Sequence, residues 1–271
     1  MRRSLLLLLV ACGHPAAKVD APTNTAADTN GAAPSVDESK LGGLVLVPSV
    51  GENAITYTPH ADAFAFDTNK AVTAGAKRTL VGMGGERTTV VAEQASALPY
   101  GCDNNSLEGT PLSPVDNKAR LPAGVAWMLP ADSTWTVSPL KIERGAHAAK
   151  FELYRLGPLA LDLRRTQPSE GTATIQSRGA SLVVETFKRE LMDGAEPALA
   201  TIDFSDPDMR LQIPVPVAGW ALSANGPYLV VLHTQGFEGA SLETFLVDVR
   251  PDHQRVAKIE SMAVYLYQCA F

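Results

Sequence analysis

The segment WALSANGPYLVVLH, residues 220–233, decides the fold class because it contains two apolar runs separated by a turn signal. Asn225 and Gly226 lie between the runs, and both residue types tolerate the positive φ angles of tight hairpin turns. The segment ETFLVDVRPDHQRVAKIESMAVYLYQ, residues 243–268, then predicts a strand, a turn at 251–254 and one or two more strands. The C-terminal part is therefore predicted to be an antiparallel meander.

Similar strand signals occur from residue 41 onward, as short runs rich in β-branched and aromatic residues between Gly, Pro, Asn and Asp. In one of them, Leu159, Leu161 and Leu163 alternate with polar or small residues, Asp162 among them, which predicts one buried and one solvated face. The clearest runs are LVLV (44–47), RTTVVAEQ (87–94), VAWML (125–129), TWTV (134–137), KFELYRL (150–156), LALDLRR (159–165), TATIQ (172–176), SLVVETF (181–187) and ATIDF (200–204).

Helix signals are scarce, and only ETFKRELMDG, residues 185–194, is a plausible helix. Many strands without alternating helices predict an all-β fold, either an antiparallel β-sandwich or a barrel-like meander. Two similar segment pairs, ALDLR with ATIQS (from 160 and 173) and LVDVR with AKIES (from 246 and 257), leave a β-propeller as an alternative.

The first 11 residues have the layout of a secretory signal peptide, with Arg2 and Arg3 followed by an apolar run over residues 5–11. The run is too short for a transmembrane helix, which needs about 20 apolar residues. The tetrapeptide LVAC, residues 9–12, resembles the lipobox of bacterial lipoproteins. This resemblance covers residues 1–12 only. It implies that the signal is cut before Cys12 and that Cys12 is acylated.

The same resemblance implies a membrane partner through the lipid anchor at Cys12, because two or three acyl chains at one site hold a protein stably on a bilayer. It also implies a location in the bacterial cell envelope, outside the cytoplasm, either periplasmic or surface-exposed. Residues 12–40 are dominated by Ala, Pro, Thr, Asn and Asp, which predicts a disordered linker. Residues 41–271 are predicted to form the all-β domain, with two lobes dividing near 145–150 as an alternative.

The chain has 3 cysteines, so lipidation of Cys12 leaves Cys102 and Cys269 as an even pair in a compartment that permits disulfides. We predict that these two residues bond to each other. The alternative is two separate buried thiols.

The formal net charge is −6, and basic residues occur at most as neighbouring pairs. No basic cluster can neutralise a run of phosphates, so a nucleic-acid partner is not expected. The five histidines are scattered and no HExxH or CxxC motif occurs, so no zinc site is predicted. The weak calcium candidates are Asp203, Asp206 and Asp208, although aspartate beside proline is also ordinary turn chemistry. No cofactor is predicted.

Catalytic motifs are absent from the sequence as well. No GxSxG motif occurs, and Gly82, Gly84 and Gly85 are followed by Arg87 where a nucleotide-binding loop has its third glycine, so a hairpin turn is the better explanation. His60, Asp62 and Asp67 are better explained by a solvated turn than by a metal site. Paired carboxylates cannot be named, because their distance in the folded chain is not visible in the sequence. No catalytic residue is predicted.

The three tryptophans are the remaining candidates for ligand binding. Trp127 and Trp220 lie within apolar runs and are predicted to pack in the core. Trp135, flanked by Thr134 and Thr136, is the candidate for an exposed ligand-binding ring.

Two function classes remain. The first is a lipid-anchored cell-envelope β-protein that binds or scaffolds a protein or glycan without catalysis, which the lack of motifs favours. The alternative is a lipid-anchored extracytoplasmic hydrolase whose site is assembled from distant loops. A cleft with two carboxylates, or with a serine and histidine pair, would favour the hydrolase.

Overall fold

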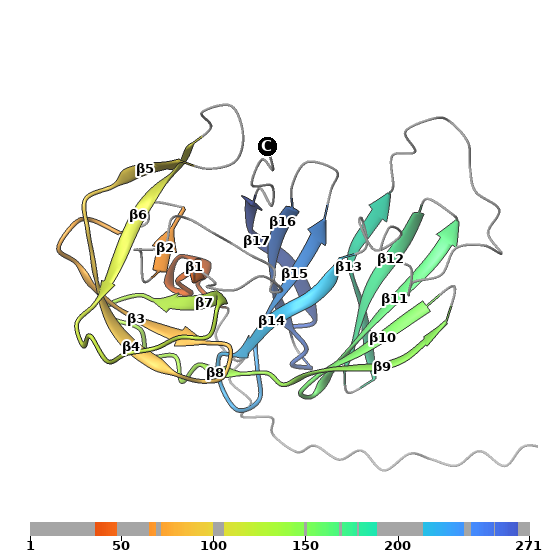
Figure 1. Ribbon diagram of the computed structural model, residues 1–271. Helices are drawn as coiled ribbons and strands as arrows, with labels where there is room; N and C mark the ends of the chain where they lie inside the picture. The colour runs from red at the N-terminus through yellow and green to blue at the C-terminus, as the bar shows by residue number, and fades with distance from the viewer. Residues whose placement is uncertain are drawn as a thin grey trace, which may run out of the picture. The chain divides into compact units, whose positions relative to one another are not determined.

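The computed structural model describes residues 36–47, 65–68, 72–99, 106–148, 151–167, 170–177, 179–188, 214–235, 240–251 and 253–264. Across these residues the strands form three antiparallel sheets, which confirms the predicted all-β class (Figure 1). In the described part of the chain, the one helical element is the 3₁₀ turn η1, Glu38–Lys40.

The first sheet is a closed antiparallel barrel of six strands in the order β2-β1-β7-β3-β4-β6, closed by the pairing of β2 with β6. A further strand, β5, pairs with β6 outside the ring. The strands are β1 (Gly43–Val47), β2 (Ala65–Asp67), β3 (Lys77–Gly82), β4 (Arg87–Ala92), β5 (Ser96–Pro99), β6 (Ser106–Pro114) and β7 (Gly124–Leu129). Small and branched apolar side chains, Val45, Leu80, Val90, Leu112 and Ala126 among them, form the core of the barrel.

Two five-stranded sheets follow. The meander sheet has the order β13-β12-β11-β10-β9, and the C-terminal sheet has the order β17-β16-β15-β14-β8. The strands are β8 (Ser138–Pro139), β9 (Ile142–Ala148), β10 (Phe151–Leu156), β11 (Leu159–Gln167), β12 (Glu170–Ser177), β13 (Ala180–Lys188), β14 (Val215–Ala221), β15 (Tyr228–Gln235), β16 (Ala240–Asp248) and β17 (Arg255–Val264).

The hairpin predicted within residues 220–233 is confirmed. Strands β14 and β15 pair antiparallel with Ala221 opposite Tyr228. Gly226 has a φ of 89°, in the left-handed region that glycine adopts without strain, and the Leu222 amide donates to the Pro227 carbonyl across the turn. The turn predicted at 251–254 is also confirmed, because it joins the paired strands β16 and β17.

The C-terminal sheet is buried on both faces. In β15, Leu229 and Val231 belong to a core shared with the barrel, whereas Tyr228, Val230 and Leu232 belong to a core shared with the meander sheet. Successive side chains of a strand point to opposite faces, so an uninterrupted apolar run is what a strand between two cores requires.

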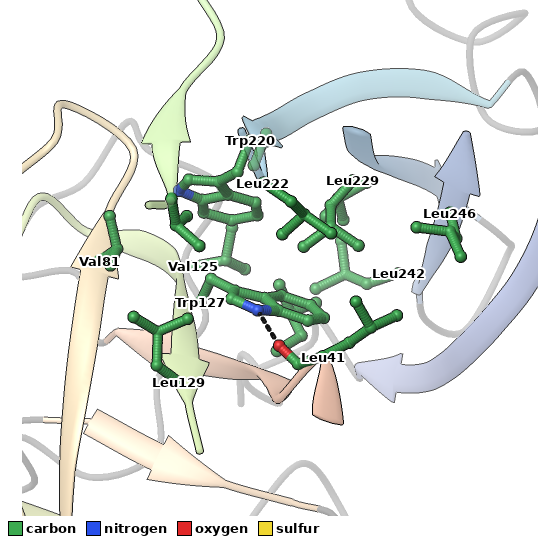
Figure 2. Close-up of a cluster of buried hydrophobic side chains, with 14 of the residues drawn as sticks. Leu41, Val81, Val125, Trp127, Leu129, Trp220, Leu222, Leu229, Leu242 and Leu246 are labelled. Carbon is green, nitrogen blue, oxygen red and sulfur yellow. Dashed lines mark hydrogen bonds between the residues drawn. The ribbon is translucent and has the colours of Figure 1, made fainter. Parts of the chain in front are cut away.

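The core between the barrel and the C-terminal sheet is built around two tryptophans, as predicted. Trp127 of β7 and Trp220 of β14 are each 0% exposed, and their ring centroids lie 5.9 Å apart (Figure 2). The Trp127 indole N–H donates to the Leu41 carbonyl at 2.8 Å, and the Trp220 indole N–H donates to the Gly82 carbonyl at 3.3 Å. Both buried donors are therefore satisfied.

Two further hydrogen bonds link the barrel to the elements that follow it. The Leu44 amide of β1 donates to Glu260 Oε2 of β17 at 2.9 Å. The Arg87 guanidinium of β4 donates to the Val137 carbonyl at 2.8 Å. The barrel and the C-terminal sheet are thus joined by polar contacts as well as by apolar packing.

The disordered linker predicted over residues 12–40 is wrong for residues 36–40, which belong to the folded part and include η1, while residues 12–35 lie outside the described part of the chain. Val36 and Leu41 both belong to the core shared by the barrel and the C-terminal sheet. Gly42, with a φ of 97°, then leads into β1, and a Cβ atom there would lie 2.0 Å from the Met128 carbonyl oxygen. Residues 145–148, near the expected division between lobes, belong to β9. Residues 35–271 form one compact unit.

Two local predictions are wrong. The run TWTV, residues 134–137, forms no strand, because Val137 packs into the core and its carbonyl accepts a side-chain hydrogen bond instead of joining a ladder. The helix expected over residues 185–194 is wrong for residues 185–188, which belong to β13, where Glu185 pairs with Ala173 of β12; residues 189–194 lie outside the described part. Sheet pairing there overrides the local helix signal. Residues 200–204 lie outside the described part.

The propeller alternative is not supported, because the two similar segment pairs occupy different positions in their sheets. Counted along the chain, β11 and β12 are the third and fourth strands of the meander sheet, whereas β16 and β17 are the fourth and fifth strands of the C-terminal sheet. The alternation of Leu159, Leu161 and Leu163 is confirmed, since all three are buried. Asp162, predicted to face solvent, is also buried, and Arg164 Nε donates to its Oδ2 at 2.8 Å.

Candidate functional site

Most of the residues considered as candidate sites in the sequence lie outside the described part of the chain. These residues are Cys12, Cys102, Cys269, Asp203, Asp206, Asp208, His60 and Asp62. Lipidation of Cys12, the pairing of Cys102 with Cys269 and the calcium site therefore stay predictions.

Trp135 is described, and it is half-buried instead of fully exposed. Its ring packs against the core that contains Trp127 and Trp220. Its indole N–H donates to the Lys40 carbonyl at 3.2 Å, and its amide donates to Ser133 Oγ at 3.3 Å. These contacts fix the ring against the residues that precede β1, so part of the surface expected to stack on a ligand is used within the fold.

The glycines at 82–85 form the hairpin turn that the sequence predicts. The Gly85 amide donates to the Gly82 carbonyl at 3.1 Å, and β3 and β4 pair directly on either side. Asp67, considered with His60 and Asp62, is 1% exposed on β2 and so does not belong to a solvated turn.

The structure brings together two glutamates that the sequence analysis did not identify. Glu185 of β13 lies opposite Ala173 of β12, and Glu243 of β16 lies opposite Leu232 of β15. Ala173 and Leu232 both belong to the core between the meander sheet and the C-terminal sheet. The two glutamates are therefore on the facing sides of these sheets, where they share a hydrogen bond.

Lys258 of β17 lies beside the two glutamates. We call Glu185 and Glu243 the carboxylate pair, and these two residues together with Lys258 the carboxylate pair with its lysine. Its Nζ lies 3.0 Å from Glu243 Oε1, and the side chain of Glu243 is only 13% exposed. Oε2 of Glu185 and Oε2 of Glu243 are both buried, and neither accepts a hydrogen bond from an N–H or hydroxyl group among the described residues. One lysine thus faces two carboxylates that are largely withdrawn from water.

The proton affinity of the pair follows from this geometry. Burial, the negative charge of Glu243 and the hydrogen bond between the two side chains raise the pKa of Glu185 to about 7, against the opposing effect of Lys258. The charge of Glu243 disfavours ionisation of its neighbour, so Glu185 keeps its proton to a higher pH than an ordinary glutamate does. Glu185 can therefore release or take up a proton near neutral pH.

One sequence signal for the pair exists, although it is weak. Both glutamates open the tripeptide ETF, which occurs at residues 185–187 and 243–245. In each case the glutamate lies within a strand that carries apolar residues on the face toward the other sheet. A glutamate among such neighbours requires a partner, and the partner is supplied by a different sheet.

Other buried charged groups pair within single sheets. Asp248 accepts hydrogen bonds from Arg250 Nε at 2.9 Å and Nη2 at 2.6 Å at the turn between β16 and β17. Glu152 of β10, 1% exposed, accepts from Arg144 Nε and from the Tyr154 hydroxyl. These pairs stabilise the strands that carry them.

No group of three or more His, Cys, Asp or Glu residues that could hold a metal ion occurs among the described residues. In the same part of the chain, no helix is long and apolar enough to cross a membrane. Comparison with known proteins gives no match to a family model, to a curated protein or to a solved structure.

Proposed function

We propose that this chain is a lipid-anchored protein of the bacterial cell envelope, held to a membrane through acyl chains on Cys12, with an all-β body that binds or scaffolds a protein or glycan outside the cytoplasm. The observation that carries the proposal is the tetrapeptide LVAC, residues 9–12, directly after a basic start and a short apolar run. Acylation supplies the membrane affinity that a chain of net charge −6 does not gain from anionic lipid.

The segment between the anchor and the body fits a tether. Val36 belongs to the core, so residues 13–35 separate Cys12 from the folded part. A flexible chain of this composition and length has an average reach of about 25 Å. The body would therefore stand clear of the lipid headgroups while staying near the membrane.

A non-catalytic role is supported by the use of the buried charges within the fold. Asp248 and Glu152 are each 1% exposed. Asp248 is paired with Arg250 of the turn after β16, and Glu152 is paired with Arg144 of the neighbouring strand β9. One observation favours the hydrolase instead, namely the raised pKa of Glu185 beside Glu243, because paired carboxylates perform general acid and base chemistry. Hydrolysis of chromogenic glycosides by the wild type, lost in both E185Q and E243Q, would favour that second candidate.

The anchor is tested by metabolic labelling of bacteria that express the full chain with a palmitate analogue. The wild type is expected to incorporate the label and Cys12→Ala to incorporate none, because the acyl acceptor is removed. Cys102→Ala is the matched control, since it removes a cysteine and is expected to leave labelling unchanged. Equal labelling of wild type and Cys12→Ala would contradict the proposal.

The second expectation for an envelope location is a disulfide between Cys102 and Cys269. Closing so long a loop stabilises a folded chain by up to about 5 kcal/mol on the chain-entropy model. Peptide mapping of the protein from its native envelope, without reduction, is expected to recover the two cysteine peptides linked. Recovery of both as free thiols would rule the bond out.

A further inference from the structure

We infer that the carboxylate pair, Glu185 and Glu243, forms a proton-dependent latch between the meander sheet and the C-terminal sheet, closed while Glu185 is protonated and weakened when Glu185 ionises. This inference concerns the body alone and is independent of the anchor.

The latch lies where two sheet edges meet. β13 is an edge strand of the meander sheet, β17 is an edge strand of the C-terminal sheet, and the two strands are in contact. Among the described residues, no strand pairing connects these sheets. The contact therefore depends on side chains, namely partly buried apolar ones such as Leu182, Val184 and Val256, and the carboxylate pair with its lysine.

The charge balance at this edge changes with one proton. With Glu185 protonated, the two glutamates and Lys258 sum to zero charge. Without this proton, the cluster carries one net negative charge, and two buried Oε2 atoms are left without a donor. Like charges at short range in a partly buried site repel. Ionisation of Glu185 therefore pushes β13, which carries Glu185, away from β16, which carries Glu243.

The groups that face the pair define its charge environment. On the C-terminal sheet these are Lys258 of β17 and Glu243 itself, while Leu232 of the neighbouring β15 is apolar. On the meander sheet, Gly171 and Ala173 of β12 lie on the same face by register, and Arg165 of β11 lies on that face beyond them. Glu152 of β10 also lies on that face, two strands beyond β12, and is ion-paired with Arg144. Lys258, whose side chain is 49% exposed, is thus the cation that the structure places directly at the pair.

The direction of the pH effect follows from the raised pKa of Glu185, about 7 in the folded chain against an ordinary value of 4.5. A group whose pKa is raised on folding contributes stability that is complete below its ordinary pKa and is lost as pH rises through the folded value. The latch is therefore closed in mildly acidic conditions and weakens between about pH 5 and pH 8.

Amide hydrogen exchange of the full chain, corrected for the intrinsic exchange rate at each pH, tests the latch. In the wild type, the protection of β13 is expected to fall roughly tenfold between about pH 5.5 and pH 8.5, after allowance for solvent screening at a half-buried site. Peptides from β10, inside the same sheet, are expected to keep their protection.

In E185Q the protection of β13 is expected to change by less than about twofold over the same range, because glutamine donates a hydrogen bond to Glu243 and carries no charge. E243Q is a second variant with the same expected result, and it replaces E185Q if E185Q folds poorly. E143Q, which alters a glutamate on β9 with its own exposed lysine partner, is the matched control and should behave like the wild type. Constant protection of β13 in the wild type, or the same loss in E185Q and E243Q, would overturn the inference.

Discussion

Trp127→Ala is expected to lower the free energy of unfolding by about 3–5 kcal/mol, the range for truncating a large aromatic side chain in a core. Trp127 is 0% exposed and packs on Trp220, between the barrel and the C-terminal sheet (Figure 2). Its removal leaves a cavity where the two meet and deprives the Leu41 carbonyl of its indole donor. Urea unfolding monitored by circular dichroism measures the change.

Two variants separate the contributions at this site. Trp127→Phe keeps an aromatic ring but loses the N–H donor, so a smaller loss is expected than for alanine. Trp135→Ala removes a half-buried tryptophan at the edge of the same core and is expected to cost clearly less than Trp127→Ala. An equal cost for Trp127→Ala and Trp135→Ala would contradict the assignment of Trp127 to the centre of the core.

Arg250→Ala is expected to cost about 3 kcal/mol at neutral pH, near the lower end of the range for breaking a buried ion pair. Asp248 is 1% exposed, and its carboxylate accepts hydrogen bonds from the Arg250 amide and from two guanidinium nitrogens. Removal of Arg250 leaves this carboxylate buried without its cation. The lower end applies because the side chain of Arg250 is 21% exposed, so water screens part of the interaction.

The cost of Arg250→Ala should depend on pH. Burial tends to raise the pKa of Asp248, but the hydrogen bonds and charge of Arg250 prevail and hold it below the ordinary value of 3.8. A lowered pKa contributes stability above the unfolded value that is lost as pH falls through the folded one. The difference between wild type and variant, measured by urea unfolding, is therefore expected to shrink as pH is lowered from 7 toward 3.

Lys141→Ala is the control for Arg250→Ala, because it breaks an ion pair with Glu143 whose side chains are 82% and 50% exposed. Exposed pairs contribute between zero and about 1 kcal/mol. If the two variants cost the same, the ion pair of Asp248 and Arg250 does not have the structural role assigned to it.

The sequence was most informative where local and tertiary preferences agree. The hairpin within residues 220–233 was predicted because its turn residues and both apolar runs indicate the same structure, and the structure confirms it. The same run, YLVVL, is apolar on both faces because β15 lies between two cores. By contrast, TWTV has the composition of a strand, yet Trp135 and Val137 pack individually against a core and do not pair in a ladder.

The candidate site was not predictable from local patterns. Glu185 and Glu243 belong to different sheets, and only the packing of one sheet on the other brings their side chains together. Asp162 illustrates the same limit, since its alternating position indicates a solvated face but the structure buries it. Burial that depends on a partner element distant in the sequence leaves little trace in the residues themselves.

We propose that a lipid on Cys12 holds this chain to the cell envelope. Intact mass spectrometry of the protein extracted from bacterial membranes tests this anchor most directly. We expect a mature chain that begins at Cys12 and carries a diacylglycerol on the cysteine sulfur, with an acyl chain on the new amine. A chain that retains residues 1–11, or one in which Cys12 is unmodified, would contradict it.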